Sequence, residues 1–496
     1  MRTQHLPRTI TRILNTASAL VLLGSLSQMA LASDRRLAEE NQAVKENAKR
    51  NVILIIGDGM DDNQITIARN YLKGARGKLQ LDHLPLRSTS QVITVDEEQP
   101  DLPIYVADSA NSATSMATGV ATSRGRISTT AGDDQDLTTI AELAKAGGYA
   151  TGIVSTADVA DATPAVFISH IALRGCKGPS DMQPTENTPS WSNLEACVND
   201  QIARGGKGSI AQQIATGNTD IVLGGGSSHF DQTAESSDLT LLALARKHGY
   251  QTVSSAEELP GLETSQKVLG LFAPSNLPTI WQGEKGRIAE KPSPSLLNRL
   301  DWRLGSVELP EPMRCEKNPQ FGSTPTLKQL TDTALKHLAA QDGEGFFLMI
   351  ESASIDKQSH ARNPCGSIGE LEQLEDALIS ALAFAEQEPE TLILVTADHG
   401  QAAQLKPNIS LFAHGGIAVY TPGHVARLIT PENQIMAVNY ATNDFPYEEH
   451  TGVNVPLYSN QQGLGRIAPM VTQPEIFNIM AQYLNLPAAP SKPAAQ

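Results

Sequence analysis

Five short apolar runs constrain the fold of this chain more than any other feature. They are rich in β-branched residues and apolar at successive positions, which is typical of strands buried on both faces of a parallel sheet. The runs are Asn51–Gly57, Ala150–Ser155, Ile221–Leu223, Phe346–Ile350 and Thr391–Thr396. Helical patterns lie between them at Leu137–Ala146, Thr326–Ala340 and Glu370–Glu386. This alternation predicts an α/β fold, a three-layer sandwich around a mostly parallel sheet.

The first residues predict a signal peptide over residues 1–32. A basic start, an apolar stretch and a small-residue cleavage pattern follow one another: Arg2, Arg8 and Arg12; residues 13–23; and residues 30–32. The apolar stretch is too short to span a bilayer, and no later segment offers about 18 uninterrupted apolar residues. We therefore expect an exported protein that starts at Ser33, periplasmic or secreted, with no membrane association.

Charge and cysteine content further limit which partners, covalent links and metal sites we expect. The chain has 38 Lys and Arg against 54 Asp and Glu, so its acidic surface argues against nucleic acid as a partner. Four cysteines in an exported protein predict disulfides, and proximity in the sequence favours Cys176–Cys197 and Cys315–Cys365. None forms a CxxC pair, which argues against a thiolate zinc site.

Two segments depart from the regular pattern. Residues 236–324 carry scattered Pro and Gly, and we expect them to form a peripheral insertion instead of a separate domain. The Pro- and Ala-rich end, residues 487–496, is typical of a disordered tail.

Polar residues cluster soon after the buried strands. They are Asp58, Asp161 with Thr163, Glu351, and Asp398 with His399. In open α/β sheets the carboxyl ends of the strands line the ligand crevice, so four strands would aim oxygen or nitrogen ligands into one crevice. One such Asp alone is a common turn residue, but chance rarely places all four.

Histidines near carboxylates predict metal binding. Asp356 and His360 stand four positions apart, so on a helix they share a face and could bind one metal; alone, such a pair is more often a surface salt bridge. His399 beside Asp398 suits zinc, which favours imidazole nitrogen and carboxylate oxygen. His450 is a weak signal by itself.

A run of small residues, Ser109–Thr118, predicts a helix that begins near Asp108. An arbitrary serine there would be a helix cap. A helix N-terminus, however, also offers free N–H groups to an anion, so a nucleophilic Ser109 would meet a phosphate that is already stabilised.

With these residues in view, the chain closely resembles the bacterial alkaline phosphatases of the enterobacterial type. The matching stretches run in the family's order from residue 56 to residue 452. They are IGDGMDDNQITIARNY (Ile56–Tyr71), ADSANSATSMATGV (Ala107–Val120), VSTADVADATPA (Val154–Ala165), RGCKGPS (Arg174–Ser180), ESASIDKQSHARNPCG (Glu351–Gly366), VTADHG (Val395–Gly400) and EEHTG (Glu448–Gly452).

The resemblance implies a role for each site residue. Asp356, His360 and His450 would hold one zinc ion, and Asp58, Asp398 and His399 a second. A magnesium ion would share Asp58 with Thr163 and Glu351, and Asp161 would bind it through water. Ser109 would be the nucleophile, Arg174 would bind two phosphate oxygens, Asp108 would orient Arg174, and Lys357 would contact phosphate through water.

The resemblance also implies an alkaline phosphatase-like fold that hydrolyses small phosphate monoesters, is inhibited by its product, inorganic phosphate, and forms a homodimer. The family's disulfides match the pairing favoured by proximity. Because ligands come from residue 58 through residue 450, the two ends of the chain must meet in one site, which predicts a single domain over residues 33–486.

Three positions depart from the family pattern. Asp61 stands where the family usually has Gly, Ser359 where a carboxylate is common, and Gln401 where a His is found. None is a direct ligand in that pattern, so we expect the chemistry to survive.

Other functions fit less well. A sulfatase would need a Cys or Ser followed by x-Pro-x-Arg, a phosphodiesterase usually lacks the equivalent of Arg174, and a phosphoglycerate mutase is a further possibility in the same superfamily. An exported phosphate- or metal-binding protein without turnover would leave Ser109 unexplained.

Overall fold

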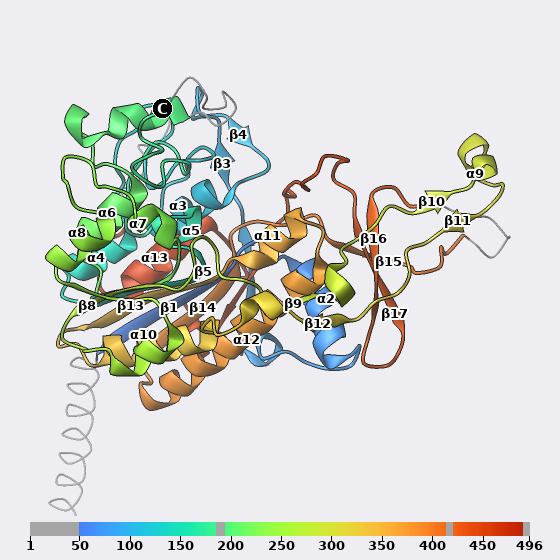
Figure 1. Cartoon of the computed structure of the whole chain (residues 1–496). Helices are drawn as coiled ribbons and strands as arrows, with labels where there is room; N and C mark the ends of the chain where they lie inside the picture. The colour runs from blue at the N-terminus through green and yellow to red at the C-terminus, as the bar shows by residue number, and fades with distance from the viewer. Residues whose placement is uncertain (1–48, 185–193, 413–419, 490–496) are drawn as a thin grey trace, which may run out of the picture. The chain divides into compact units, whose positions relative to one another are not determined.

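A ten-stranded sheet forms the centre of the computed structural model, which describes residues 49–184, 194–412 and 420–489 (Figure 1). Its strand order is β19-β2-β18-β14-β1-β13-β5-β6-β8-β7. The strands are β1 (Arg50–Gly57), β2 (Leu86–Gln91), β5 (Ala150–Asp158), β6 (Ile221–Gly225), β7 (Tyr250–Val253), β8 (Lys267–Leu271), β13 (Gly345–Ser352), β14 (Thr391–Ala397), β18 (Val455–Ser459) and β19 (Met470–Thr472).

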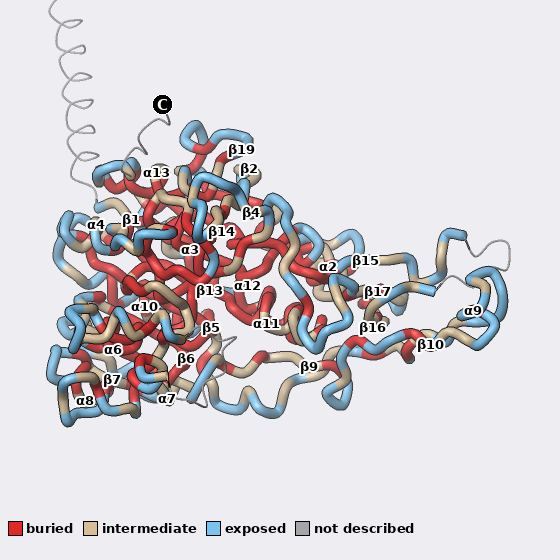
Figure 2. Tube along the Cα trace, turned by 90° about the horizontal axis from the view of Figure 1, so that it is seen from above, coloured by how far each residue is buried: buried red, intermediate tan, exposed pale blue. Residues whose placement is uncertain are grey.

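The five strands predicted from the sequence are all present, as β1, β5, β6, β13 and β14. From β14 across to β7 every neighbouring pair is parallel, whereas β18 is antiparallel to both β14 and β2. The prediction of a mostly parallel sheet is therefore confirmed. Figure 2 shows the central strands buried along their length, as expected for strands that are apolar on both faces.

Helices cover both faces of the sheet, as the alternation along β1 requires. Val52, Leu54 and Ile56 pack into one core together with α3, α4 and α13, and Ile53 and Ile55 pack into the other with α2, α10 and α12. The structure is thus the three-layer sandwich that the sequence predicts. The helices are α2 (Asp62–Lys73), α3 (Ser109–Thr118), α4 (Ile140–Ala146), α5 (Ala162–Ala165), α6 (Ile210–Thr216), α7 (Ser227–Phe230), α8 (Leu241–Lys247), α9 (Leu296–Leu300), α10 (Leu327–Ala339), α11 (Ser354–His360), α12 (Pro364–Gln387) and α13 (Gln473–Tyr483).

Side-chain caps fix where the predicted helices begin. Thr326 caps α10 in a capping box with Gln329, and Thr139 caps α4 in the same way with Glu142. The cap at Thr139 explains why α4 starts at Ile140, later than the predicted start at Leu137. Among the described residues, no helix combines the length and the apolar character that crossing a bilayer requires.

The structure corrects the predicted insertion over residues 236–324. Its first part supplies α8, β7 and β8, and the two strands extend the edge of the main sheet. The rest is peripheral and includes two short strand pairs. These pairs are β9 (Trp281–Gly283) with β12 (Cys315–Lys317) and β10 (Ser293–Pro294) with β11 (Val307–Glu308).

Two small sheets lie outside this region. They are the pair β3 (Thr94–Val95) and β4 (Pro103–Ile104), and the three-stranded sheet of β15 (Gln404–Lys406), β17 (Ile435–Tyr440) and β16 (His424–Ile429).

From Arg50 onward the chain groups into one compact unit. The predicted signal peptide, residues 1–32, and residues 490–496 of the predicted tail lie outside the described residues. At the described end, the amide of Ala489 donates to Asn478 Oδ1 at 3.2 Å.

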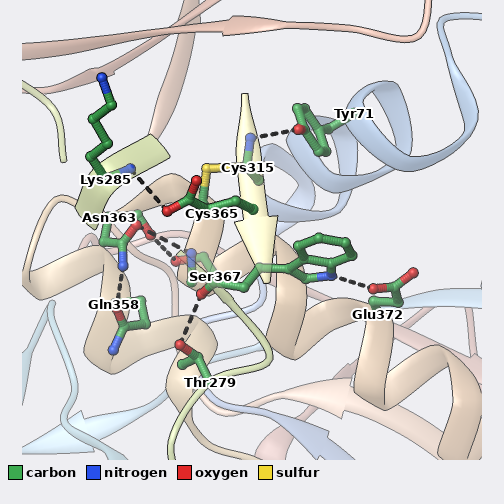
Figure 3. Close-up of a disulfide and its surroundings, with 12 residues drawn as sticks. Tyr71, Thr279, Lys285, Cys315, Gln358, Asn363, Cys365, Ser367 and Glu372 are labelled. Carbon is green, nitrogen blue, oxygen red and sulfur yellow. Dashed lines mark hydrogen bonds between the residues drawn. A yellow bond between two sulfur atoms is a disulfide. The ribbon is translucent and has the colours of Figure 1, made fainter. Parts of the chain in front are cut away.

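Both predicted disulfides are formed, Cys176–Cys197 and Cys315–Cys365. Figure 3 shows the second, which joins β12 to the first turn of α12. The amide of Cys315 donates to the hydroxyl of Tyr71 in α2 at 2.7 Å, so this disulfide ties the peripheral strand pair to two helices of one layer.

We expect loss of Cys315–Cys365 to cost more stability than loss of Cys176–Cys197. The first closes a loop of 50 residues and the second a loop of 21, which corresponds to about 4 and about 3 kcal/mol of unfolded-state entropy. Thermal and urea unfolding of the two Cys→Ala double variants measures the order. A larger loss from removing Cys176–Cys197 would contradict it.

Candidate active site

Four adjacent parallel strands bring the candidate residues to one edge of the sheet. β14, β1, β13 and β5 are neighbours, so their carboxyl ends meet at the same edge. Asp58 follows β1, Asp161 and Thr163 follow β5, Asp398 and His399 follow β14, and Glu351 lies within the last residues of β13. All six are buried.

One cluster that could hold a metal ion, the first cluster, consists of Asp356, His360 and His450. Asp356 and His360 lie on one face of α11, as their spacing predicts, and each imidazole Nε2 atom lies 3.3 Å from an Asp356 carboxylate oxygen. The two Nε2 atoms are 3.0 Å apart. All three residues offer ligand atoms within 4.8 Å of one another.

The hydrogen bonds of these histidines fix which nitrogen faces the cluster. Nδ1 of His360 contacts the carbonyl oxygen of Glu448, and Nδ1 of His450 contacts that of Ala107 at 2.9 Å. A carbonyl only accepts, so Nδ1 carries the proton and Nε2 presents its lone pair. Two lone pairs 3.0 Å apart require a cation between them, either a proton or a metal ion.

A second cluster consists of Asp58, Asp398 and His399, all buried. His399 Nε2 lies 3.4 Å from a carboxylate oxygen of each aspartate, and its Nδ1 contacts the carbonyl oxygen of Gly400 at 3.2 Å. Burial lowers the pKa of His399 to about 4, so its Nε2 is a free electron pair at neutral pH. The His399 and His450 rings stack with centroids 3.6 Å apart, which places the two clusters side by side.

A third group offers only oxygen. Thr163 and Glu351 are each 1% exposed, and Asp58 is shared with the second cluster. Burial raises the pKa of Glu351 to about 7 and, with the charges of Asp356 and Asp398, raises that of Asp58 well above its usual range. Carboxylates packed in this way need compensating positive charge to ionise together.

Ser109 is the first residue of α3, and its hydroxyl faces the second cluster. Ser109 Oγ lies 3.2 Å from His399 Nε2 and 3.5 Å from Asp58 Oδ1. The helix cap is Asp108, whose carboxylate accepts from the amide of Asn111 at 3.0 Å. The cap function is therefore already filled, and the Ser109 hydroxyl is available for chemistry.

Arg174 and Lys357 line a cavity of about 390 Å³ together with Ser109. Arg174 lies 3.2 Å from Asp108 and 3.4 Å from Asp161, and Lys357 lies 2.9 Å from Asp161 and 3.7 Å from Asp58. Burial alone would lower the pKa of Lys357, but the carboxylates of Asp161 and Asp58 raise it above its usual range. Both side chains therefore remain charged.

The three residues that depart from the family pattern, Asp61, Ser359 and Gln401, form hydrogen bonds next to the first cluster. Gln401 Nε2 donates to Asp356 Oδ1, and the backbone N–H of Gln401 donates to Asp61 Oδ2 at 3.2 Å. Asp61 also caps α2, and burial raises its pKa to about 6. The hydroxyl of Ser359 accepts from Gln64 and donates to the carbonyl oxygen of Ile355.

Sequence reasoning missed the ion pair of Arg362 and Glu448, which fixes the loop that carries His450. Their side chains are 8% and 0% exposed, and Arg362 Nε lies 2.5 Å from Glu448 Oε1. Arg362 also donates to the carbonyl oxygens of Phe445 and Pro446. The available signals were that each residue stands two positions from a histidine of the first cluster and lies in a stretch that matches the family.

Known proteins resemble the chain over most of its length. The family model described as alkaline phosphatase matches residues 49–454. The alkaline phosphatase of Escherichia coli (strain K12) is 37% identical over 468 residues, which cover 91% of this chain and 90% of that protein. Streptomycin-6-phosphate phosphatase of Streptomyces griseus is 39% identical over 450 residues, 88% of this chain and 91% of that protein.

Solved structures share the fold. The alkaline phosphatase of the Antarctic bacterium TAB5 superposes with a TM-score of 0.62 at 21% identity, over 88% of this chain and 99% of that one.

We expect Arg362→Met to weaken metal binding at the first cluster. It leaves Glu448 as a buried charge without its partner, which costs about 3–5 kcal/mol of stability. Loss of such a supporting contact lowers metal affinity about 10- to 100-fold. Thermal unfolding and a zinc competition titration measure the two effects.

Arg69→Met is the matched control, because Arg69 forms a bidentate pair with Asp82 at 2.7 Å and contacts no cluster residue that the structure describes. Reduced stability with unchanged zinc affinity in Arg362→Met would show that the pair supports the fold but not the metal site.

Proposed function

The chain belongs to the alkaline phosphatase family, and from this premise we propose that Ser109 carries a phosphoserine intermediate in a site that binds two zinc ions and one magnesium ion. As a member of this family the protein is a metal-dependent phosphomonoester hydrolase. The observation that carries the proposal is the position of Ser109, whose Oγ lies 3.2 Å from His399 Nε2 of the second cluster and which lines one cavity together with Arg174.

The proposed reaction has two displacements at phosphorus. Ser109 Oγ attacks the phosphate monoester, the bond between phosphorus and the ester oxygen breaks, and the alcohol leaves with a proton. Water then attacks the phosphoserine, which releases inorganic phosphate and restores the Ser109 hydroxyl. Free N–H groups in the first turn of α3 favour an anion at this position.

Arg174 is the proposed phosphate-binding residue. Its planar guanidinium can donate two parallel hydrogen bonds to phosphate oxygens. Asp108 orients it from one side at 3.2 Å, and Asp108 is held in turn by the amides of Asn111 and Gly125. Lys357 adds a second positive charge and, by family resemblance, contacts phosphate through water.

The two clusters fit zinc. Each combines carboxylate oxygen with imidazole nitrogen, the donor set that zinc favours. Within the described residues, Asp398 Oδ2 is a buried oxygen with no hydrogen-bond partner, as expected for an atom that binds a metal ion. When bound, zinc ions supply Lewis-acid charge that stabilises the oxygens entering and leaving phosphorus.

The oxygen-only group fits magnesium. Thr163 Oγ1 is buried and has no hydrogen-bond partner in the part of the chain that the structure describes. With Asp58 and Glu351 it forms a hard donor set, which magnesium prefers. Asp161 would bind the ion through water, because its two oxygens already pair with lysines.

Further properties follow as proposals from the family and the chain. We expect inorganic phosphate to inhibit as product, the protein to form a homodimer, and residues 33–486 to act as a single domain after signal-peptide removal. Two disulfides support a periplasmic or secreted location. The acidic composition disfavours nucleic acid as a substrate or partner.

We expect Ser109→Ala to lower kcat on the order of 10³-fold or more and to abolish phosphoserine trapped by acid quenching, because the nucleophile is lost. Metal content should stay unchanged. Ser112→Ala is the matched control, since Ser112 lies on the same helix, is buried, and has no hydrogen-bond partner for its hydroxyl among the described residues. Acid-stable phosphate on any residue other than Ser109 would refute the assignment.

Exhaustive chelation should abolish hydrolysis of an aryl phosphate, and zinc should restore it. After reconstitution with both ions, elemental analysis should find two zinc ions and one magnesium ion per chain, because two donor sets contain nitrogen and the third contains only oxygen. Three zinc ions per chain in the presence of excess magnesium would contradict the proposed donor preference.

A further inference from the structure

Asp161 is surrounded by more positive charge than the proposed mechanism uses. Lys357 Nζ lies 2.9 Å from its Oδ2, and Arg174 lies 3.4 Å from its Oδ1. A third cation, Lys177, lies 2.9 Å from the same Oδ1 atom. Lys177 is not among the described residues that line the cavity with Ser109, but Asp161, which it contacts, does line that cavity.

Lys177 is also held in place by a second carboxylate, that of Asp158. Its Nζ atom also lies 3.5 Å from Oδ2 of Asp158, which is 2% exposed and pairs with His229 Nε2 at 3.0 Å. Asp158 Oδ1 accepts from the Ala160 amide at 2.9 Å, so this carboxylate is fixed at the end of β5. Lys177 therefore bridges two fixed carboxylates and has little freedom to leave.

Lys177 and Arg174 stand on one loop, with Cys176 between them. The Cys176–Cys197 disulfide and the hydrogen bond from the Ile210 amide to the Cys176 carbonyl oxygen, at 3.0 Å, restrain that loop. Both cations therefore reach the same oxygen atom, Asp161 Oδ1, from a restrained backbone.

The distances show which of the two cations contacts Asp161 Oδ1 more closely. Lys177 is 0.5 Å closer to Asp161 Oδ1 than Arg174 is, since the two distances are 2.9 and 3.4 Å. Lys357 contacts the other carboxylate oxygen, Asp161 Oδ2, at 2.9 Å, so Asp161 has a lysine on each of its oxygens. Lys177 thus neutralises much of the charge that would otherwise draw Arg174 towards Asp161.

We propose that Lys177 is a positioning residue that occupies Asp161, keeps Arg174 available for phosphate, and weakens the attraction of the oxygen-only site for magnesium. This inference rests on the proposed function, because it assigns phosphate to Arg174 and magnesium to the group beside Asp161. The inference predicts that one substitution changes magnesium affinity and phosphate affinity in opposite directions. Removal of Lys177 leaves more negative charge on Asp161, which strengthens magnesium binding. The same charge draws Arg174 towards Asp161 and away from phosphate, which weakens phosphate binding.

The test uses calorimetric titration of zinc-loaded protein with magnesium, and of zinc- and magnesium-loaded protein with inorganic phosphate. In Lys177→Met we expect about three- to tenfold tighter magnesium binding and about three- to tenfold weaker phosphate binding. Lys177→Arg keeps the charge and should stay within about twofold of the unmutated protein for both ligands.

Lys145→Met is the matched control. Lys145 is 29% exposed against 25% for Lys177, and it pairs with the carboxylate of Asp220 at 2.6 Å, away from the site residues. Its removal takes one lysine away from a carboxylate, as Lys177→Met does, but should leave both affinities unchanged.

The outcomes separate the two proposals. Unchanged affinities in Lys177→Met, or weakening of both ligands together with lower thermal stability, would overturn the positioning role and leave the proposed function intact. An unmutated, zinc-loaded protein that binds neither magnesium nor phosphate would overturn the proposed function itself and this inference with it. Tighter magnesium and weaker phosphate binding, restored by Lys177→Arg, would support the inference.

Discussion

Buried negative charge at one edge of the sheet is the constraint on which the rest of the site depends. Asp58, Glu351, Asp356 and Asp398 are at most 4% exposed, and each ionised carboxylate in such surroundings costs several kcal/mol unless positive charge lies beside it. The protein supplies part of that charge through Lys357, which lies 3.7 Å from Asp58, while Arg174 and Lys177 pair with Asp108 and Asp161 at the same site. The two histidine clusters are arranged to receive the remainder as cations.

The parallel sheet makes this concentration of charge possible. Ligands that are distant in sequence become neighbours because β14, β1, β13 and β5 end at the same edge, and α11 and the His450 loop close over it. The histidines are also held by backbone carbonyl oxygens of other segments. His450 is oriented by the carbonyl oxygen of Ala107, so the segment that leads into the helix bearing Ser109 also positions a proposed metal ligand.

The departures from the family pattern show how a supporting layer can change while the ligands stay. Gln401 Nε2 donates to Asp356, and Asp61 accepts from the backbone N–H of Gln401. The first of these contacts acts directly on a proposed ligand. Differences between this chain and its relatives in metal affinity are therefore expected to arise in this layer, with the same reaction retained.

The sequence by itself determined the central strands, the two-sided packing of the sheet and the residue types of the site. β1, β5, β6, β13 and β14 were predictable because strands buried on both faces are apolar at every position. β18 and β2 were not, because each is short and mixes polar with apolar residues, and β7 and β8 lie in a stretch whose Pro and Gly content masks them.

Only the tertiary structure decided which nitrogen of each histidine faces a metal, which residue caps α3, and which cations contact Asp161. The physical reason is that these properties belong to pairs of groups far apart in sequence. The type of a residue can be read from the sequence, and it limits the chemistry of the side chain. The orientation, protonation state and partners of that side chain depend on the groups that the folded chain places within about 3 Å of it.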